Sequence, residues 1–168
     1  SVTNGGLFPD WIELHNSGAS DTNLAGWSLT DDSNARQFGF PANTVIPAGG
    51  YLVVWCDNAT NAPGLHTGFA LGKQGETLSL FDAQTNRLDA LTFGLQLTNY
   101  TVGRVGAVWQ LTAPTPNGEN VAAPLAAQLP QRAVRRTVPI TRSFQRGLEA
   151  GTRDSTGRPG ARYWQLRT

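Results

Sequence analysis

Short segments in which apolar and polar residues alternate recur along the first 111 residues of this 168-residue chain. In Trp11–His15, Ile12 and Leu14 fall on one face and the other three residues fall on the opposite face, which is the period of a half-buried β-strand. Stretches rich in Gly, Asn, Asp and Pro separate the segments and are typical of turns. The strands predicted in this way are Trp11–His15, Leu24–Thr30, Gln37–Phe40, Tyr51–Cys56, Thr77–Phe81, Arg87–Phe93, Tyr100–Val105 and Ala107–Leu111.

The absence of helical patterning in residues 1–120 decides the fold class. No stretch there repeats apolar residues with the 3.6-residue period of a helix, and strands about 8–12 residues apart indicate a sandwich or a barrel. The sequence therefore predicts an all-β fold of two stacked sheets or one closed sheet. The apolar run Tyr51–Cys56 predicts a strand that is central or buried on both faces. Cys56, the single cysteine, is expected to be a buried, inert thiol.

The composition changes near residue 120. Residues 121–130 are rich in Ala and Pro and are predicted to be a linker. Residues 131–168 form a basic, largely irregular extension that is partly ordered or begins a further domain. Within it, residues 143–150 have the composition of a short helix and residues 162–166 that of a strand.

The net charge of +1 conceals a division between the two parts of the chain. Residues 1–125 carry four basic and ten acidic side chains, a formal charge of −6. Residues 126–168 carry nine Arg and two acidic side chains, a formal charge of +7. The two parts are therefore expected to meet different partners.

Five segments, in the same order along the chain, carry a family resemblance. Together they resemble the lamin tail domain family, in its bacterial form, over residues 10–118. The segments are Asp10–Asn16 (D-W-I-E-L-H-N), Leu24–Asp31 (L-A-G-W-S-L-T-D), Ile46–Val53 (I-P-A-G-G-Y-L-V), Leu71–Leu80 (L-G-K-Q-G-E-T-L-S-L) and a closing region with Gly103-Arg104, Trp109 and Pro114–Gly118.

The resemblance implies an immunoglobulin-like β-sandwich over residues 1–120. It also implies a non-catalytic module of a larger, extracytoplasmic bacterial protein, with structural, binding or targeting roles. Family members usually begin with a strand upstream of the D-W-I-E-L segment, whereas Ser1–Pro9 contains no such strand pattern. A missing strand leaves a sheet edge open, and the segment Tyr163–Leu166 is a candidate to fill it.

The chain offers no recognisable catalytic constellation. His15 and His66 are the only histidines, and no His-Glu-x-x-His, Cys-x-x-Cys, phosphate-loop or G-x-S-x-G pattern occurs. Catalysis needs a positioned nucleophile, base or metal, so the sequence predicts no enzyme and implies no cofactor. Asp31, Asp32 and Asn34 are a weak calcium candidate, because calcium requires six to eight oxygen ligands; capping of a turn explains these residues better.

Two sets of residues are candidates for binding a partner. Trp11, Glu13 and His15 form the polar face of their strand, which is either an exposed recognition strip or, for Trp11, a cover over the end of the sandwich. In the extension, Arg side chains suit phosphate groups and two aromatic residues suit stacking on bases. These candidates are Arg132, Arg135, Arg136, Arg142, Arg146, Tyr163 and Trp164.

Two functions follow. The first is a module that attaches a secreted or surface protein to another protein or to an extracellular polymer. The alternative is a nucleic-acid-associated protein that binds through its basic extension. A third reading rests on the faint likeness of residues 157–165 to a segment of secreted metallopeptidases, although no zinc-binding motif is present. No transmembrane run is visible, and both a monomer and a strand-swapped dimer fit the sequence.

Overall fold

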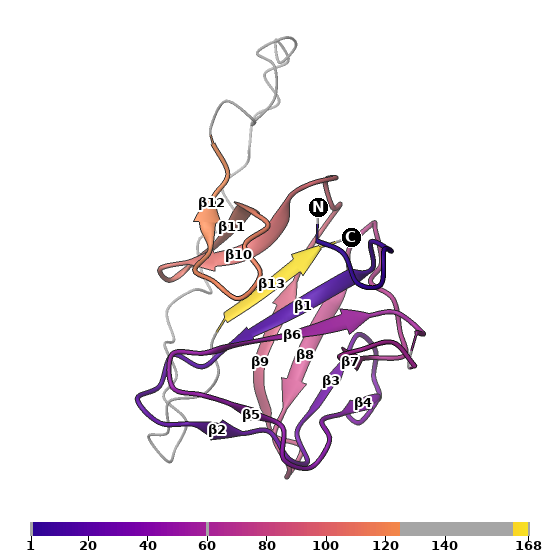
Figure 1. The fold of residues 1–168 in the computed structure, drawn as a ribbon, viewed down its shortest axis with the longest axis vertical. Helices are drawn as coiled ribbons and strands as arrows, with labels where there is room; N and C mark the ends of the chain where they lie inside the picture. Colours follow the sequence, from indigo (N-terminus) through magenta and orange to yellow (C-terminus); the bar gives the residue numbers. More distant parts are fainter. Residues whose placement is uncertain (1, 60, 125–162, 168) are drawn as a thin grey trace, which may run out of the picture. The chain divides into compact units, whose positions relative to one another are not determined.

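The structure, a computed structural model, describes residues 2–59, 61–124 and 163–167 (Figure 1). The residues it describes form strands and turns and no helix, and none of them belongs to a helix able to cross a bilayer. The strands are β1 (Asp10–His15), β2 (Thr22–Asn23), β3 (Ser28–Thr30), β4 (Phe38–Gly39), β5 (Val45–Ile46), β6 (Tyr51–Cys56), β7 (Leu65–His66), β8 (Thr77–Phe81), β9 (Arg87–Thr92), β10 (Thr101–Val105), β11 (Val108–Ala113), β12 (Val121–Ala122) and β13 (Tyr163–Arg167).

Two main sheets and a two-stranded ribbon are formed by the described residues. The larger sheet has the order β12-β11-β10-β13-β1-β6-β7, and the smaller has the order β4-β3-β8-β9. All pairs are antiparallel except β6 and β7. Strands β2 and β5 pair only with each other. The strand β13, yellow in Figure 1, lies between β1 and β10. It pairs with β1 along the edge that was expected to be open because the usual first strand of the family is missing.

The two sheets bury one apolar core between them. Ile12, Leu14 and Val54 contribute from the larger sheet, and Leu29, Leu80 and other residues contribute from the smaller one. Each of these five named residues is at most 1% exposed. Because successive side chains of a strand point to opposite faces, the alternation read from the sequence places this apolar set on the inner face. The all-β sandwich prediction is therefore confirmed.

Part of the outer face of the larger sheet is covered by residues 114–122, here called the cover segment. It follows β11 and ends in β12, where Thr112 pairs with Ala122. Asn120 donates from Nδ2 to the carbonyl of Arg104 at 2.9 Å. A Cβ on Gly103 would lie 2.7 Å from the Asn120 side chain, so glycine is required for this close approach. The segment is thus fixed against the sheet.

The predicted strands agree with the structure except in short elements. The expected strand Leu24–Thr30 is formed only at Ser28–Thr30. The two-residue strands β2, β5, β7 and β12 were not predicted. Val121 and Ala122, assigned to the linker by composition, form β12 in the sandwich. Two-residue strands carry too little periodicity to be distinguished from turns. The predicted helix at 143–150 and most of the extension lie outside the described residues.

Candidate functional site

The predicted recognition strip on β1 is not an exposed surface in the described fold. Trp11 is 0% exposed and Glu13 is 2% exposed, so the exposed-strip alternative is wrong for these two residues, and the burial of Trp11 agrees with its other interpretation as a cover. The alternation correctly placed them opposite Ile12 and Leu14. Glu13 is buried because a segment more than 100 residues later in the sequence folds over it, which a local pattern cannot reveal.

Glu13 is a buried carboxylate with a specific partner in the cover segment. Its Oε1 accepts a hydrogen bond from the backbone N–H of Asn117 at 2.5 Å. Desolvation by burial raises the pKa of Glu13 to about 7, and the hydrogen bond from Asn117 opposes part of that rise. Glu13 therefore anchors the cover segment and changes its charge near neutral pH.

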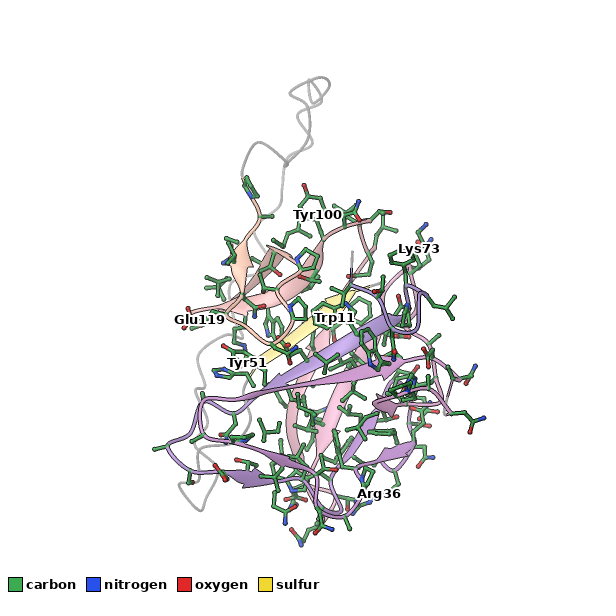
Figure 2. All side chains as sticks on the ribbon, in the orientation of Figure 1. Trp11, Arg36, Tyr51, Lys73, Tyr100 and Glu119 are labelled. Atoms are coloured by element: carbon green, nitrogen blue, oxygen red, sulfur yellow. The ribbon has the colours of Figure 1, made fainter. Side chains whose placement is uncertain are left out.

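His15 lies at the other end of β1 and is partly exposed. Its ring stacks on Tyr51 of β6, with ring centroids 4.3 Å apart and planes inclined by 11°. Burial lowers the pKa of His15, while the backbone of Gly49 and the charge of Glu119 act in the opposite direction. Figure 2 labels Tyr51 and Glu119, which lie toward this end of β1. Of the predicted strip, His15 alone keeps access to solvent.

Two of the three residues considered for calcium, Asp32 and Asn34, instead organise a turn after β3, and Asp31 donates its backbone N–H to Gln37 Oε1 at 3.0 Å. Asp32 accepts hydrogen bonds at Oδ1 from the Thr30 hydroxyl at 2.9 Å and from the Asn34 N–H at 2.5 Å. Asn34 accepts one at Oδ1 from the N–H of Arg36. Their oxygens thus cap the local backbone, in agreement with the turn prediction. Among the described residues, no three His, Cys, Asp or Glu side chains converge as metal ligands would.

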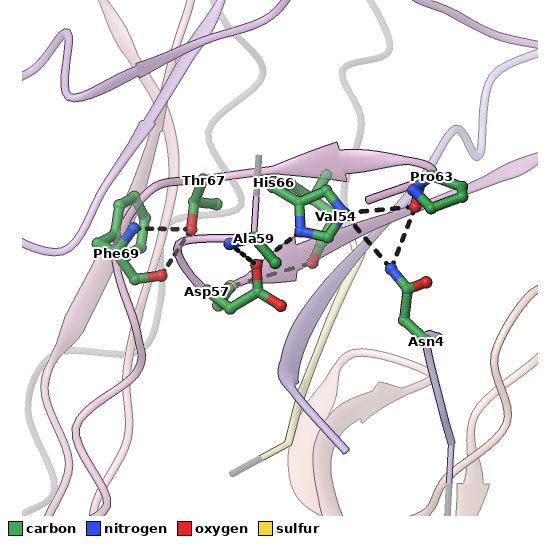
Figure 3. Close-up of polar contacts among 9 residues, drawn as sticks. Asn4, Val54, Asp57, Ala59, Pro63, His66, Thr67 and Phe69 are labelled. Atoms are coloured by element: carbon green, nitrogen blue, oxygen red, sulfur yellow. Dashed lines mark hydrogen bonds and ion pairs between the residues drawn. The ribbon is translucent and has the colours of Figure 1, made fainter. Parts of the chain in front are cut away.

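Asp57 and His66 form a polar cluster beyond the end of β6 (Figure 3). His66 donates from Nδ1 to Oδ1 of Asp57 at 2.6 Å, and Asp57 also accepts from the N–H of Ala59 at 2.9 Å. His66 Nε2 lies 3.4 Å from Nδ2 of Asn4, which donates to the carbonyl of Pro63 at 3.1 Å. Sequence patterns did not single out this pair, because its members are nine residues apart and match no motif.

The hydrogen bonds of this cluster join the N-terminal turn to the loop after β6. The His66 side chain is 2% exposed, and both of its nitrogens are directed at protein atoms. A general base needs an exposed nitrogen within reach of a substrate proton, which His66 does not present. The cluster instead ties the N-terminal turn at Asn4 to the loop after β6. The nearby Cys56 is 1% exposed, as predicted, and burial raises the pKa of its thiol, so it is unreactive.

Four large apolar side chains are exposed in the loops at one end of the sheet. Leu7 and Phe8 are 67% and 63% exposed, and Leu95 and Leu97 are 60% and 47% exposed. We call these four residues the apolar patch. Periodicity does not distinguish single apolar residues in loops from core residues, so the sequence carries no signal that these four are exposed.

The topology places the two halves of the apolar patch at the same end. Leu166 of β13 pairs with both Ile12 of β1 and Val102 of β10, and both pairings are antiparallel. Strands β1 and β10 therefore run in the same direction and begin at the same end of the sheet. Residues 7–8 immediately precede β1, and residues 95–97 precede β10. Two strand spacings, about 10 Å, separate the starts of β1 and β10. The patch therefore lies along one end of the sandwich.

The loop that carries Leu95 and Leu97 is fixed to its neighbour. The Gln96 N–H donates to the carbonyl of Lys73 at 3.0 Å, and the Phe93 N–H donates to the carbonyl of Glu76 at 3.0 Å. Gly75, with φ of 103°, allows this contact, since a Cβ there would collide with the carbonyl of Phe93. Figure 2 shows Lys73 and Tyr100, on the two loops concerned. The patch is thus presented on anchored backbone.

Comparison with protein-family models agrees with this fold. The Lamin Tail Domain model matches residues 1–94, more than half of the chain. The chain belongs to the Lamin Tail Domain family. No curated protein and no solved structure matches it. The Lamin Tail Domain is a non-enzymatic, immunoglobulin-like binding domain, and the match includes four of the five segments that carry the resemblance.

The remaining predicted site residues belong to the part of the chain after the Lamin Tail Domain match. Tyr163 and Trp164 lie on β13, where they pair in register with His15 and Leu14 of β1. The other candidates lie outside the described residues, and their binding role stays a prediction. These are Arg132, Arg135, Arg136, Arg142 and Arg146.

Proposed function

We propose that this Lamin Tail Domain is a non-catalytic module that binds a protein partner through the apolar patch. The observation that supports the proposal is the concentration of Leu7, Phe8, Leu95 and Leu97 on anchored loops at one end of the sandwich. Exposed apolar groups that gather at one place are typical of protein–protein contact sites. Rigid loops also lose little conformational entropy on binding, which favours affinity.

The chemistry of the apolar patch favours a protein over a polymer as partner. None of its four side chains has a polar atom; three are leucines, and Phe8 is the single aromatic member. Protein interfaces have such apolar centres surrounded by a polar rim. The partner expected is therefore a protein that offers an apolar pocket or ridge.

To test this, a photo-reactive amino acid is incorporated at position 97 of the protein in the cells that produce it, so that a bound partner is cross-linked there. Val108 provides the matched control, because it is 63% exposed but belongs to the hairpin between β10 and β11 at the opposite end of β10. The partner cross-linked at 97 is then purified and titrated. We expect the double substitution Leu95→Ser and Leu97→Ser to weaken binding about tenfold to a hundredfold, and Val108→Ser to leave it unchanged. Equal effects of both variants would contradict the proposal.

We further propose that the module belongs to a larger, extracytoplasmic bacterial protein. The support is the likeness of the five sequence segments to bacterial family members, which occur as accessory modules. Fractionation of the producing cells, with an antibody to the domain, tests the location. Recovery in the envelope or the medium is expected, and recovery with the cytosolic enzymes would contradict it.

Nucleic acid is the second candidate partner, and the charge of +7 on residues 126–168 favours it. Binding through these Arg residues would weaken steeply with salt, because phosphate contacts release counterions. A titration of the full chain with a DNA duplex at several salt concentrations tests this. Binding independent of salt, or none at low salt, would remove this candidate.

A further inference from the structure

The position between β1 and β10 is a gap that an extended segment must fill. Its present occupant, β13, pairs with β1 over five residues, from Trp11–Arg167 to His15–Tyr163. On its other side it pairs with β10 at Val102–Leu166 and Gly103–Gln165. It connects two strands that otherwise share no pairing, so without it the larger sheet would be divided in two.

The surroundings of this gap require a strand. Ile12 and Val102, one on each side, pack in or against the core, and both are paired with Leu166. An empty gap would expose this part of the core. It would also leave the facing N–H and C=O groups of β1 and β10 without partners, and buried backbone groups of this kind are nearly always paired. The gap therefore binds extended backbone strongly.

The contacts that fill the gap do not depend on which chain supplies the strand. Pairing involves backbone groups in a fixed register, as in other cases of strand addition to a sheet edge. Thirty-eight residues, 125–162, separate the described sandwich from β13. At about 3.3 Å per residue their extended length is about 125 Å, enough to reach the gap of a neighbouring molecule.

Charge favours an approach between copies. The sandwich part, residues 1–125, has a formal charge of −6, whereas residues 126–168 have +7. The C-terminal part of one copy is therefore attracted to the sandwich of another as well as to its own. We propose that the gap between β1 and β10 is a strand-binding site, and that residues 163–167 of a second copy occupy it in exchange for those of the same chain. This inference is independent of the apolar patch and goes beyond the proposed function.

Cysteine pairs in the full-length chain test the exchange. One chain carries His15→Cys and the other carries Tyr163→Cys, positions that are directly paired between β1 and β13. Paired antiparallel residues have Cα separations of about 4.5–5.5 Å, which suit a disulfide. The native Cys56 is retained, because it is buried and its raised pKa keeps it unreactive. The two chains are mixed at high concentration, incubated and oxidised.

A disulfide-linked dimer of the two different chains supports the proposal. The matched control replaces Tyr163→Cys by Trp164→Cys, which lies on the opposite face of the same strand. We expect the cross-link to be lost in this control. We also expect it to form more slowly at high salt, which screens the attraction.

A third chain that carries both His15→Cys and Tyr163→Cys keeps the test decisive. If it forms an internal disulfide while the mixed chains never link, the gap accepts only its own strand and exchange is wrong. If neither disulfide forms although both chains are folded, the pairing of β13 with β1 is itself wrong. If the control pair, His15→Cys with Trp164→Cys, forms the disulfide as readily as His15→Cys with Tyr163→Cys, the contact is not a strand pairing, and the proposal fails.

Discussion

The two faces of the larger sheet are covered by different means, the inner face by the smaller sheet and part of the outer face by the cover segment. On the inner face, Ile12, Leu14 and Val54 pack against the apolar residues of the smaller sheet. On the outer face, Glu13 lies under a cover segment held by hydrogen bonds to the Glu13 carboxylate and to the Arg104 carbonyl. The inner face is stabilised by burial of apolar area, which is insensitive to pH. The outer face depends on polar contacts with a buried titratable group.

The largest expected effect concerns the inner face. Leu80 is 0% exposed and lies in the core, so Leu80→Ala removes buried methyl groups and leaves a cavity. We expect the free energy of unfolding to fall by about 2–5 kcal/mol, as measured by denaturant titration. Val108→Ala, at a 63% exposed position, is the control and should change it by less than about 0.5 kcal/mol. Similar losses in both variants would contradict the assigned core.

The second effect distinguishes the outer face by its pH dependence. The pKa of Glu13 is raised from 4.5 to about 7 in the folded protein. An acid with a raised folded pKa favours the native state at low pH, and this contribution is lost as pH rises from about 4.5 to 7. We expect a loss of about 2–3 kcal/mol across this window, followed by a plateau.

Glu13→Gln is the control for this pH dependence. Its amide oxygen can accept the same hydrogen bond from Asn117 without a charge, so the variant should show a much flatter stability between pH 4.5 and 7. Denaturant titrations at several pH values measure both proteins. A wild-type profile as flat as that of the variant would show that Glu13 is not buried under the cover segment.

A smaller effect tests the fit of the cover segment. A methyl group at Gly103 would lie 2.7 Å from the Asn120 side chain, so Gly103→Ala should displace the cover segment. We expect a cost of about 1–2 kcal/mol in the free energy of unfolding. Asn120→Ala removes the obstructing atoms, and the double variant should therefore lose less than the sum of the two single variants. Strict additivity would contradict the contact.

The smallest expected effect on stability is at the apolar patch. Leu97 is 47% exposed, and Leu97→Ser should change the free energy of unfolding by less than about 0.5 kcal/mol. Thermal unfolding of the variant measures this. A large loss of stability would show that Leu97 belongs to the core rather than to a contact surface.

The same contrast explains what could be predicted from the sequence. The alternation in Trp11–His15 correctly assigned Ile12 and Leu14 to the core, because strand periodicity is a local property. It could not show that Glu13 would be buried, since its partner Asn117 is 104 residues away. Trp27 and Trp109 pack against the core. Trp55, within the apolar run Tyr51–Cys56, is only half-buried on the outer face beside Trp11, which the run of apolar residues does not reveal.

The candidate site was less predictable than the fold. The role of Asp32 in a turn followed from its neighbours in sequence, because side-chain capping acts over two or three residues. The Asp57–His66 pair and the apolar patch depend on which loops meet at one end of the sandwich. The order of strands in the sheet decides which loops lie side by side, and this order cannot be read from the local pattern of a single sequence.

The place of β13 has a consequence for the time course of folding. Gln165 pairs with Glu13, so two adjacent strands of one sheet come from positions 152 residues apart in the chain. Contacts between such distant residues form slowly, because a long loop must close before any pairing energy is gained. On the ribosome, β1 and β10 emerge long before their shared neighbour. The nascent domain must therefore persist with an incomplete sheet, and a chaperone that shields bare strand edges would find its substrate during that interval.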